Sequence, residues 1–335
     1  MGALALKGKT MSMDRRRFMT LAVSSAFACG VGNPARGAGW PERLVRIVVP
    51  FPPAGAIDVV ARLMVNRLAA VWGQQVIIEN RPGAGGNIGN EQVARAEPNG
   101  YTILFTQSGI VVNRFLYPAL TYDPVTDLAP ISLLALVPNV MVVPVSSPAK
   151  SVEEFVAHAK TRRLTFGSAG NGTSSHLCGE LFKRRTGIEM THVPYRGSAP
   201  ALNDLIPGRL DLMIDSVSGV LPHIRSGGLR ALGVTATKPL AVLPQLRPLA
   251  ESALPGFDAA GLIAALAPAK TPPDIVARIQ KDLAAVLFEP AVRQRLEDLG
   301  DVVVGSTAES LAQYIKSEMD RWGPVIRDAN IRIDA

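Results

Sequence analysis

The chain has 335 residues, of which 47% are hydrophobic and 19% are charged, and its formal net charge is +7. That share of apolar residues can offset the entropy of ordering, so the composition excludes an intrinsically disordered chain. Its two cysteines exclude a disulfide-dense scaffold and a cysteine-rich metal site. The length suits one large domain or two domains of ordinary size.

Residues 1–38 have the order of an export signal. Three arginines at 15–17 precede an uncharged stretch over 18–35, and small residues follow up to Ala38. The paired arginines before Phe18 resemble a twin-arginine signal. The stretch is too rich in Ser and Gly for a permanent span, which needs about 20 predominantly apolar residues. We therefore expect residues 1–38 to be removed, with retention as an anchor and lipid attachment at Cys29 as alternatives.

The basic charge belongs mostly to this leader. Cleavage after Ala38 removes six basic residues and one acidic residue, which leaves a net charge of about +2 on the mature chain. An almost neutral surface gives no support for a nucleic-acid partner.

Two segments far apart in the sequence have the same pattern of strand, glycine-containing loop and helix. Residues 44–49 form a β-branched run, and a Pro/Gly turn separates them from a helical spacing that starts at Asp58 and stops at Gly73. Residues 164–166 lead through the loop at 167–173 into a second helix that stops at Gly187.

Both loops are candidate anion sites. The first N–H groups of a helix have no partner within the helix, and the helix dipole adds a partial positive charge there. A carboxylate, sulfate or phosphate suits such a site, and two of them facing each other would hold one ligand from both ends. The alternative is that both are ordinary connections of an α/β protein.

The rest of the chain continues the alternation of strands and helices. Further strands are expected at 76–78, 101–105, 139–145, 192–195, 210–214, 229–234 and 262–266, helices at 199–206 and 273–288, and a glycine loop at 80–89. This order predicts α/β layers with mostly parallel sheets.

Motifs for nucleotide or metal chemistry are not convincing. The run at 83–89 has Ile88 where a dinucleotide fingerprint requires its last glycine. The four histidines have no metal-ligand spacing. We expect no metal and no cofactor.

Two side-chain assignments have alternatives. Ser168, His176 and Asp215 could form a nucleophilic triad in a secreted α/β hydrolase, but the run at 167–170 is not the G-x-S-x-G turn. Asp58 either stabilises the start of its helix or contacts a ligand amine or hydroxyl.

Seven motifs in order resemble one family, the Bug receptors of tripartite tricarboxylate transporters. They are VPFPPAGAID at 49–58, ENRPGAGGNIG at 79–89, PNGYT at 98–102, FGSAGNGTSSHL at 166–177, HVPYRGS at 192–198, LIPGRLD at 205–211 and SGGLRAL at 226–232. The resemblance covers residues 41–334.

The resemblance implies a periplasmic-binding-protein fold of type II-like form. Two α/β lobes, with a ligand cleft between them, would close by hinge motion. The crossing strands would be 139–145 and 262–266. Lobe I would then comprise 41–143 plus 263–335, and lobe II would comprise 144–262.

The resemblance also implies a function, which is capture of a small carboxylate, such as a di- or tricarboxylate, for the membrane subunits of the transporter. We expect no enzymatic activity, a monomer, and a periplasmic location; a role chiefly in signalling is an alternative. The ligand-binding residues carried over by position are Pro53, Ala54, Gly55, Ala56, Ile57, Asp58, Ser108, Asn113, Gly167, Ser168, Ala169, Gly170, Thr173, His176, Tyr195 and Asp215.

The first loop departs from the family pattern at two positions. The family usually has paired glycines where this chain has Ala54 and Gly55, and a small or hydroxyl residue where it has Ile57. A methyl group restricts the backbone and Ile57 offers no hydroxyl, so we expect a tighter, less polar site, which disfavours citrate.

Overall fold

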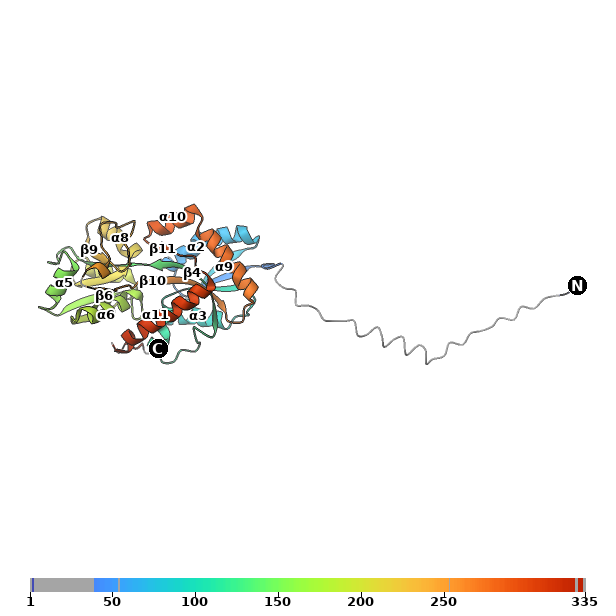
Figure 1. Ribbon diagram of the computed structural model, residues 1–335, viewed down its shortest axis with the longest axis horizontal. Coiled ribbons are helices and arrows are strands. Elements are labelled where there is room, and N and C mark those ends of the chain that lie inside the picture. Colours follow the sequence, from blue (N-terminus) through green and yellow to red (C-terminus); the bar gives the residue numbers. More distant parts are fainter. Residues whose placement is uncertain (1, 3–38, 54, 253, 329–330, 334–335) are drawn as a thin grey trace. The chain divides into compact units, whose positions relative to one another are not determined.

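The computed structural model describes residues 2, 39–53, 55–252, 254–328 and 331–333 (Figure 1). Residues 40–335 form one compact unit. Apart from residue 2, the predicted leader at 1–38, with Cys29, lies outside the described residues, and so does Ala54 of the first loop.

The strands of this unit form two sheets. The first has the order β11-β4-β10-β3-β1-β2, with β1 (Val45–Val49), β2 (Val76–Asn80), β3 (Thr102–Gln107), β4 (Leu128–Val137), β10 (Gly261–Pro268) and β11 (Val302–Val303). The second has the order β7-β6-β8-β5-β9, with β5 (Asn139–Pro144), β6 (Leu164–Ser168), β7 (Met190–Pro194), β8 (Leu212–Ser216) and β9 (Leu229–Val234).

The two sheets repeat one topology. β1 lies between its parallel neighbours β2 and β3, and β6 lies in the same way between β7 and β8. An entering strand, which comes from the other half of the chain and is antiparallel to its neighbour, lies beside each of these groups. It is β10 next to β3 in the first sheet and β5 next to β8 in the second. Each entering strand then pairs with one more, β4 or β9. No sequence repeat accompanies this similarity.

The prediction of mostly parallel sheets is wrong. Of the nine strand pairs among the described residues, four are parallel and five antiparallel. Four of the five antiparallel pairs arise because β5 and β10 run against both of their neighbours, and the fifth joins β11 to β4. The alternation of strands and helices does not show that a strand crosses into another sheet, and only the family resemblance indicated these two strands.

The helices are α2 (Ala56–Trp72), α3 (Asn87–Ala94), α4 (Gly109–Leu116), α5 (Val152–Ala159), α6 (Ser174–Thr186), α7 (Ser198–Leu205), α8 (Val217–Arg225), α9 (Pro273–Leu287), α10 (Pro290–Asp298) and α11 (Ala308–Asp328), with short 3-10 turns at Ala84–Gly86 and Leu249–Glu251. The predicted helix stops are confirmed, since Gly73 and Gly187 follow α2 and α6 with φ of 62° and 66°. The expected glycine loop at 80–89 is shorter than predicted, because α3 begins at Asn87.

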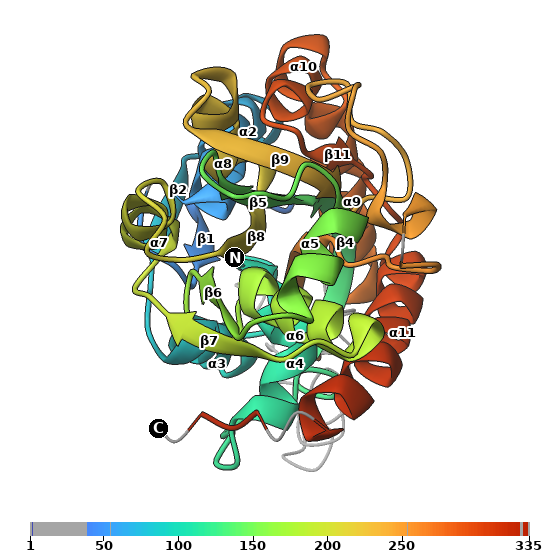
Figure 2. The same ribbon diagram turned by 90° about the vertical axis from the view of Figure 1, so that its left-hand side faces the viewer.

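The first sheet is covered on both faces. Val45, Ile47 and Val49 of β1 share one apolar cluster with α2 and α9, while Val48 belongs to a cluster on the other face with α4 and α11. Figure 2 shows α11, in red, close to α4. Burial on both faces explains why β1 reads as a continuous β-branched run and not as an alternating one.

The chain changes sheet at two places that are hydrogen-bonded to each other. Only Pro138 separates β4 from β5, and residues 235–260 return the chain from β9 to β10. The Asn139 N–H donates to Thr235 Oγ1 at 2.9 Å, and its side-chain amide donates to the Ala259 carbonyl at 3.2 Å. The chain therefore passes from the first sheet to the second at Pro138, whereas the predicted lobe boundary lies after residue 143. The limits of the two lobes stay a prediction.

Candidate functional site

Four of the strands that lead into a helix carry predicted site residues at or just after their carboxyl ends: β1 before α2, β3 before α4, β6 before α6 and β8 before α8. In open α/β sheets, ligands bind outside such carboxyl ends. Most predicted site residues lie at these four ends, and Tyr195 follows the neighbouring strand β7.

The first loop offers backbone groups to a ligand. Pro53 and Gly55 are exposed, and no side chain caps α2 at Gly55. Val59 donates its N–H to the Gly55 carbonyl at 3.0 Å, whereas the N–H groups of Ala56 and Ile57 have no acceptor among the described residues. The Ile57 side chain is fully buried in the core. Free N–H groups at the start of a 17-residue helix are the arrangement that an anion requires.

The Asp58 carboxylate is occupied by the protein. It is 1% exposed, and it accepts hydrogen bonds from Arg62 Nε at 2.7 Å and from the Asn80 amide at 3.0 Å. Asn80 also donates to the Phe51 carbonyl at 3.0 Å, which ties the end of β2 to the first loop. These contacts favour the structural role of Asp58 over a ligand contact.

The second loop binds most of its own N–H groups. Ala169 donates to Ser175 Oγ at 3.1 Å, Gly170 to Ser168 Oγ at 3.2 Å, and Gly172 to His176 Nδ1 at 3.1 Å. The expectation of a freely available loop is therefore wrong for these three groups.

Other N–H groups of the second loop stay available. Asn171, Ser174 and Ser175 have no acceptor for their N–H groups among the described residues, and Ser174 and Ser175 form the first turn of α6. Thr173 caps this helix, because its Oγ1 accepts from the His176 N–H at 3.4 Å. The first turn of α6 thus offers free N–H groups, as the start of α2 does. In α6 these groups begin at Ser174, one position after the loop at 167–173 that the sequence predicted.

Glycine at position 172 brings the second loop against the first half of the chain. Its φ is +75°, and a Cβ there would lie only 2.6 Å from Cδ1 of Leu116 in α4. On the other side, Ser174 Oγ lies near Gly261 at the start of β10. The second loop therefore contacts both α4 and the returning strand.

Two stacked histidines are hydrogen-bonded to the second loop and to the strand before it. The rings of His176 and His192 lie 3.9 Å apart with an interplanar angle of 9°, and His192 stacks in turn on Phe166 at 4.8 Å. Burial lowers the pKa of His176 to about 3 and that of His192 to about 4, and the positive charge of Lys183 acts in the same direction. Both imidazoles are therefore neutral at pH 7, and His176 Nδ1 can accept from Gly172.

The hydroxyl of Ser168 pairs with His192 and not with His176. Ser168 Oγ lies 2.6 Å from His192 Nε2, and the residue is fully buried. Asp215 is buried, its Oδ2 has no hydrogen-bond partner among the described residues, and burial raises its pKa. Nothing among the described residues links it to either histidine, so the proposed triad does not assemble and the hydrolase alternative is not supported.

The histidine pair predicts an acid-sensitive fold. Because both folded-state pKa values lie below the ordinary value of 6.5, the unfolded chain binds protons that the folded chain does not. The free energy of unfolding should be independent of these two groups above pH 6.5 and should fall as the pH drops toward 4. Urea unfolding at several pH values should show a smaller fall for His192→Gln than for the wild type. An identical fall in both proteins would contradict the assignment.

Three further candidates have partners within the protein. Ser108 Oγ accepts from the Leu262 N–H at 3.2 Å, which joins the end of β3 to the returning strand. Tyr195 donates its hydroxyl to Asp204 in α7 at 2.7 Å. Asn113 is 3% exposed and donates to the Gly85 carbonyl at 3.0 Å and to Asn87 Oδ1 at 2.7 Å.

The amide network to which Asn113 belongs was not predicted from the sequence. The Tyr122 hydroxyl donates to Asn87 Oδ1 at 3.2 Å and accepts from Asn90 Nδ2 at 2.9 Å, and Thr106 Oγ1 donates to Asn90 Oδ1 at 2.9 Å. The network joins the segment at 83–90 to Thr106 near the carboxyl end of β3 and to Asn113 in α4. The asparagines after Gly86 were a signal for such a network, but the run at 83–89 was interpreted as a failed nucleotide fingerprint and as part of a family motif.

Within the described residues, no group of three or more His, Cys, Asp or Glu side chains is placed to hold a metal ion. No membrane-spanning candidate is found among the helices of the described residues.

Two α/β halves of equal topology, joined by strands that cross between them, define the periplasmic-binding-protein fold. Residues 60–331 match the model of the tripartite tricarboxylate transporter family receptor, and the chain belongs to this family. It is 34% identical over 319 residues to protein BugT of Bordetella pertussis, covering 93% of this chain and 98% of BugT, which confirms the resemblance to the Bug receptors.

Solved structures of similar proteins contain dicarboxylates. Rpa4515 of R. palustris, solved with adipate, is 37% identical with a TM-score of 0.80, covering 88% of this chain and all of that one. MatC (Rpa3494) of Rhodopseudomonas palustris, solved with bound malate, is 33% identical with a TM-score of 0.76, covering 86% of this chain and all of that one. The protein is thus a solute-binding receptor.

Proposed function

We propose that this chain is exported, loses residues 1–38, and acts as a monomer in the periplasm, where it binds a small dicarboxylate and delivers it to the membrane subunits of a tripartite tricarboxylate transporter. It would do so without catalysing a reaction. The observation that carries the proposal is that two receptors that align with 88% and 86% of the chain hold adipate and malate.

The ligand would lie between the two predicted lobes, with its carboxylates at helix amino ends. One carboxylate would accept hydrogen bonds from the N–H groups of Ala56 and Ile57, and the other from those of Ser174 and Ser175. Each pair is free of acceptors among the described residues, and each helix adds its dipole. This arrangement needs no basic side chain, which agrees with the almost neutral mature chain.

The first loop also limits what can bind. Because the side chains of Ile57 and Asp58 are buried, this loop presents its backbone to the ligand and no hydroxyl. A third carboxylate would need its own partner to offset the loss of its water shell. We therefore expect dicarboxylates to bind more tightly than citrate.

Thermal unfolding with a panel of acetate, malate, adipate and citrate tests the proposal. A ligand present at about 100 times its dissociation constant should stabilise the protein by about 2.7 kcal/mol. We expect this from at least one dicarboxylate and not from acetate. If no dicarboxylate raises the melting temperature, the proposal is wrong; if citrate is the strongest ligand, the argument from the first loop is wrong.

A further inference from the structure

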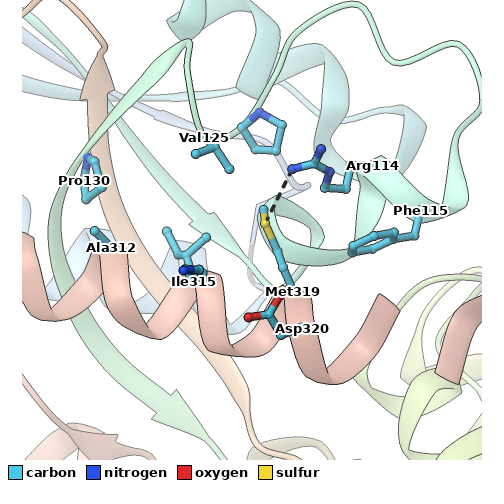
Figure 3. Close-up of a pocket in the computed structure, with 10 residues that line it drawn as sticks. Arg114, Phe115, Val125, Pro130, Ala312, Ile315, Met319 and Asp320 are labelled. Carbon is cyan, nitrogen blue, oxygen red and sulfur yellow. Dashed lines mark hydrogen bonds between the residues drawn. The ribbon is translucent and has the colours of Figure 1, made fainter. Parts of the chain in front are cut away.

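A cavity of about 560 Å³ lies where α11 packs beside α4 and the segment that precedes β4 (Figure 3). Its walls are mainly apolar, and none of its lining residues belongs to the loops after β1 and β6. Sites for small molecules usually measure about 300–1,000 Å³. The cavity therefore has the size of a ligand site and is separate from the proposed dicarboxylate site.

One face of α11 forms the floor of the cavity. Ala312, Ile315 and Met319 follow each other at spacings of three and four residues, which places them on one side of the helix. Ile315 and Met319 are 5% and 7% exposed, whereas Val125 on the opposite wall is 54% exposed. The cavity thus has a buried apolar floor and an opening to solvent at Val125.

Two cations border this apolar space without an acidic partner. Among the described residues, neither Arg114 nor Lys316 lies within 4.0 Å of a carboxylate. Figure 3 shows the Arg114 guanidinium turned toward Met319, with Nη1 3.9 Å from its sulfur. Among the residues that line the cavity, Asp320 has the one carboxylate, whereas Arg114 and Lys316 have two positive charges.

Two further acids lie in a neighbouring hollow and accept backbone hydrogen bonds. A second, polar hollow shares Arg114 with the cavity and contains Asp123 and Asp127. Asp123 Oδ1 accepts from the Val125 N–H at 2.7 Å, and Asp127 Oδ2 accepts from the Asp123 N–H at 2.9 Å. Neither of these two carboxylates forms an ion pair with Arg114 among the described residues, so its guanidinium can pair with an anion at the edge of the cavity.

We propose that this cavity is a second ligand site that takes a monocarboxylate with an extended apolar tail. The tail would pack against Ile315 and Met319, and the carboxylate would pair with Arg114 or Lys316. The combination of apolar floor and unpaired cations selects this class. A short acid lacks the apolar contact, and a neutral amphiphile lacks the charge.

NMR of protein labelled with 13C-methyl methionine tests the proposal, with octanoate as the probe. Met319 lies in the floor, and its signal can be assigned from Met319→Leu. Octanoate should shift this signal in a saturable way, while acetate should not, and octanol should bind more weakly. Absence of a shift with octanoate, or equal binding of octanol, would overturn the proposal.

Three variants locate the site and test its charge. Ala312→Phe fills the cavity at an exposed position of α11 and should abolish the shift, whereas Gln313→Phe, exposed on the same helix and outside the cavity, should leave it unchanged. Arg114→Gln should weaken octanoate about tenfold, as expected for the loss of one charged hydrogen bond. A shift that persists in Ala312→Phe, or that excess adipate displaces by competition, would show that octanoate binds elsewhere.

Discussion

Replacing Ala56 by proline should abolish tight dicarboxylate binding and leave the fold intact. Proline removes the N–H that we assign to the ligand, and a charged hydrogen bond is worth about 1.5–3 kcal/mol, so affinity should fall about tenfold to hundredfold. Position 56 is the first residue of α2, where proline is favoured, and Gly55 before it is extended, with ψ of 165°. The backbone therefore accepts the substitution without rearranging.

Calorimetry with adipate and malate, next to a denaturant titration, measures both effects. The free energy of unfolding of Ala56→Pro should stay within about 1 kcal/mol of the wild type. Ala56→Ser keeps the N–H and serves as the matched control, with affinity close to that of the wild type. Equal affinity in the proline and serine variants would show that this N–H does not hold the ligand.

Replacing Asn113 by leucine should produce the opposite pattern, a large loss of stability with little change in the affinity of the folded protein. The change removes both donors to the Gly85 carbonyl and Asn87 Oδ1 in a buried network. Each lost hydrogen bond contributes about 0.5–1.5 kcal/mol, and Asn87 Oδ1 keeps the Tyr122 hydroxyl as a partner, so we expect a total of about 1–3 kcal/mol.

Urea unfolding and calorimetry on the same sample separate the two roles of Asn113. Asn203→Leu is the matched control, because Asn203 is an exposed asparagine on α7, a helix of the same length as α4. Its change in stability should stay within about 0.5 kcal/mol. If Asn113→Leu is stable but no longer binds a dicarboxylate, Asn113 is a ligand contact, as the family resemblance implied.

The sequence was most informative where local rules decide the structure. The helix stops at Gly73 and Gly187 depend on a left-handed residue that glycine adopts at low cost, and both are found where predicted. The strand β1 was recognisable because burial on both faces produces an unbroken apolar run. The two βα loops followed from the same rules, since a strand, a turn and a helix start are each local features.

What the sequence did not show depends on contacts between distant segments. The partner of Ser168 is His192, 24 residues away on the neighbouring strand, whereas the nearer His176 was the natural candidate. The N–H groups of Ala169 and Gly170 looked available because their acceptors, Ser175 and Ser168, are side chains whose direction only the folded loop defines. The crossing strands β5 and β10 likewise have no local feature that shows which sheet they enter, and they were indicated by the family resemblance alone.

A crystal structure of the protein with adipate is the most direct measurement of the central claim, that helix amino ends and not basic side chains hold the ligand. The account predicts carboxylate oxygens within about 3.2 Å of the backbone nitrogens of Ala56 or Ile57 and of Ser174 or Ser175. An adipate held by arginine or lysine side chains, with these four N–H groups unengaged, would contradict it.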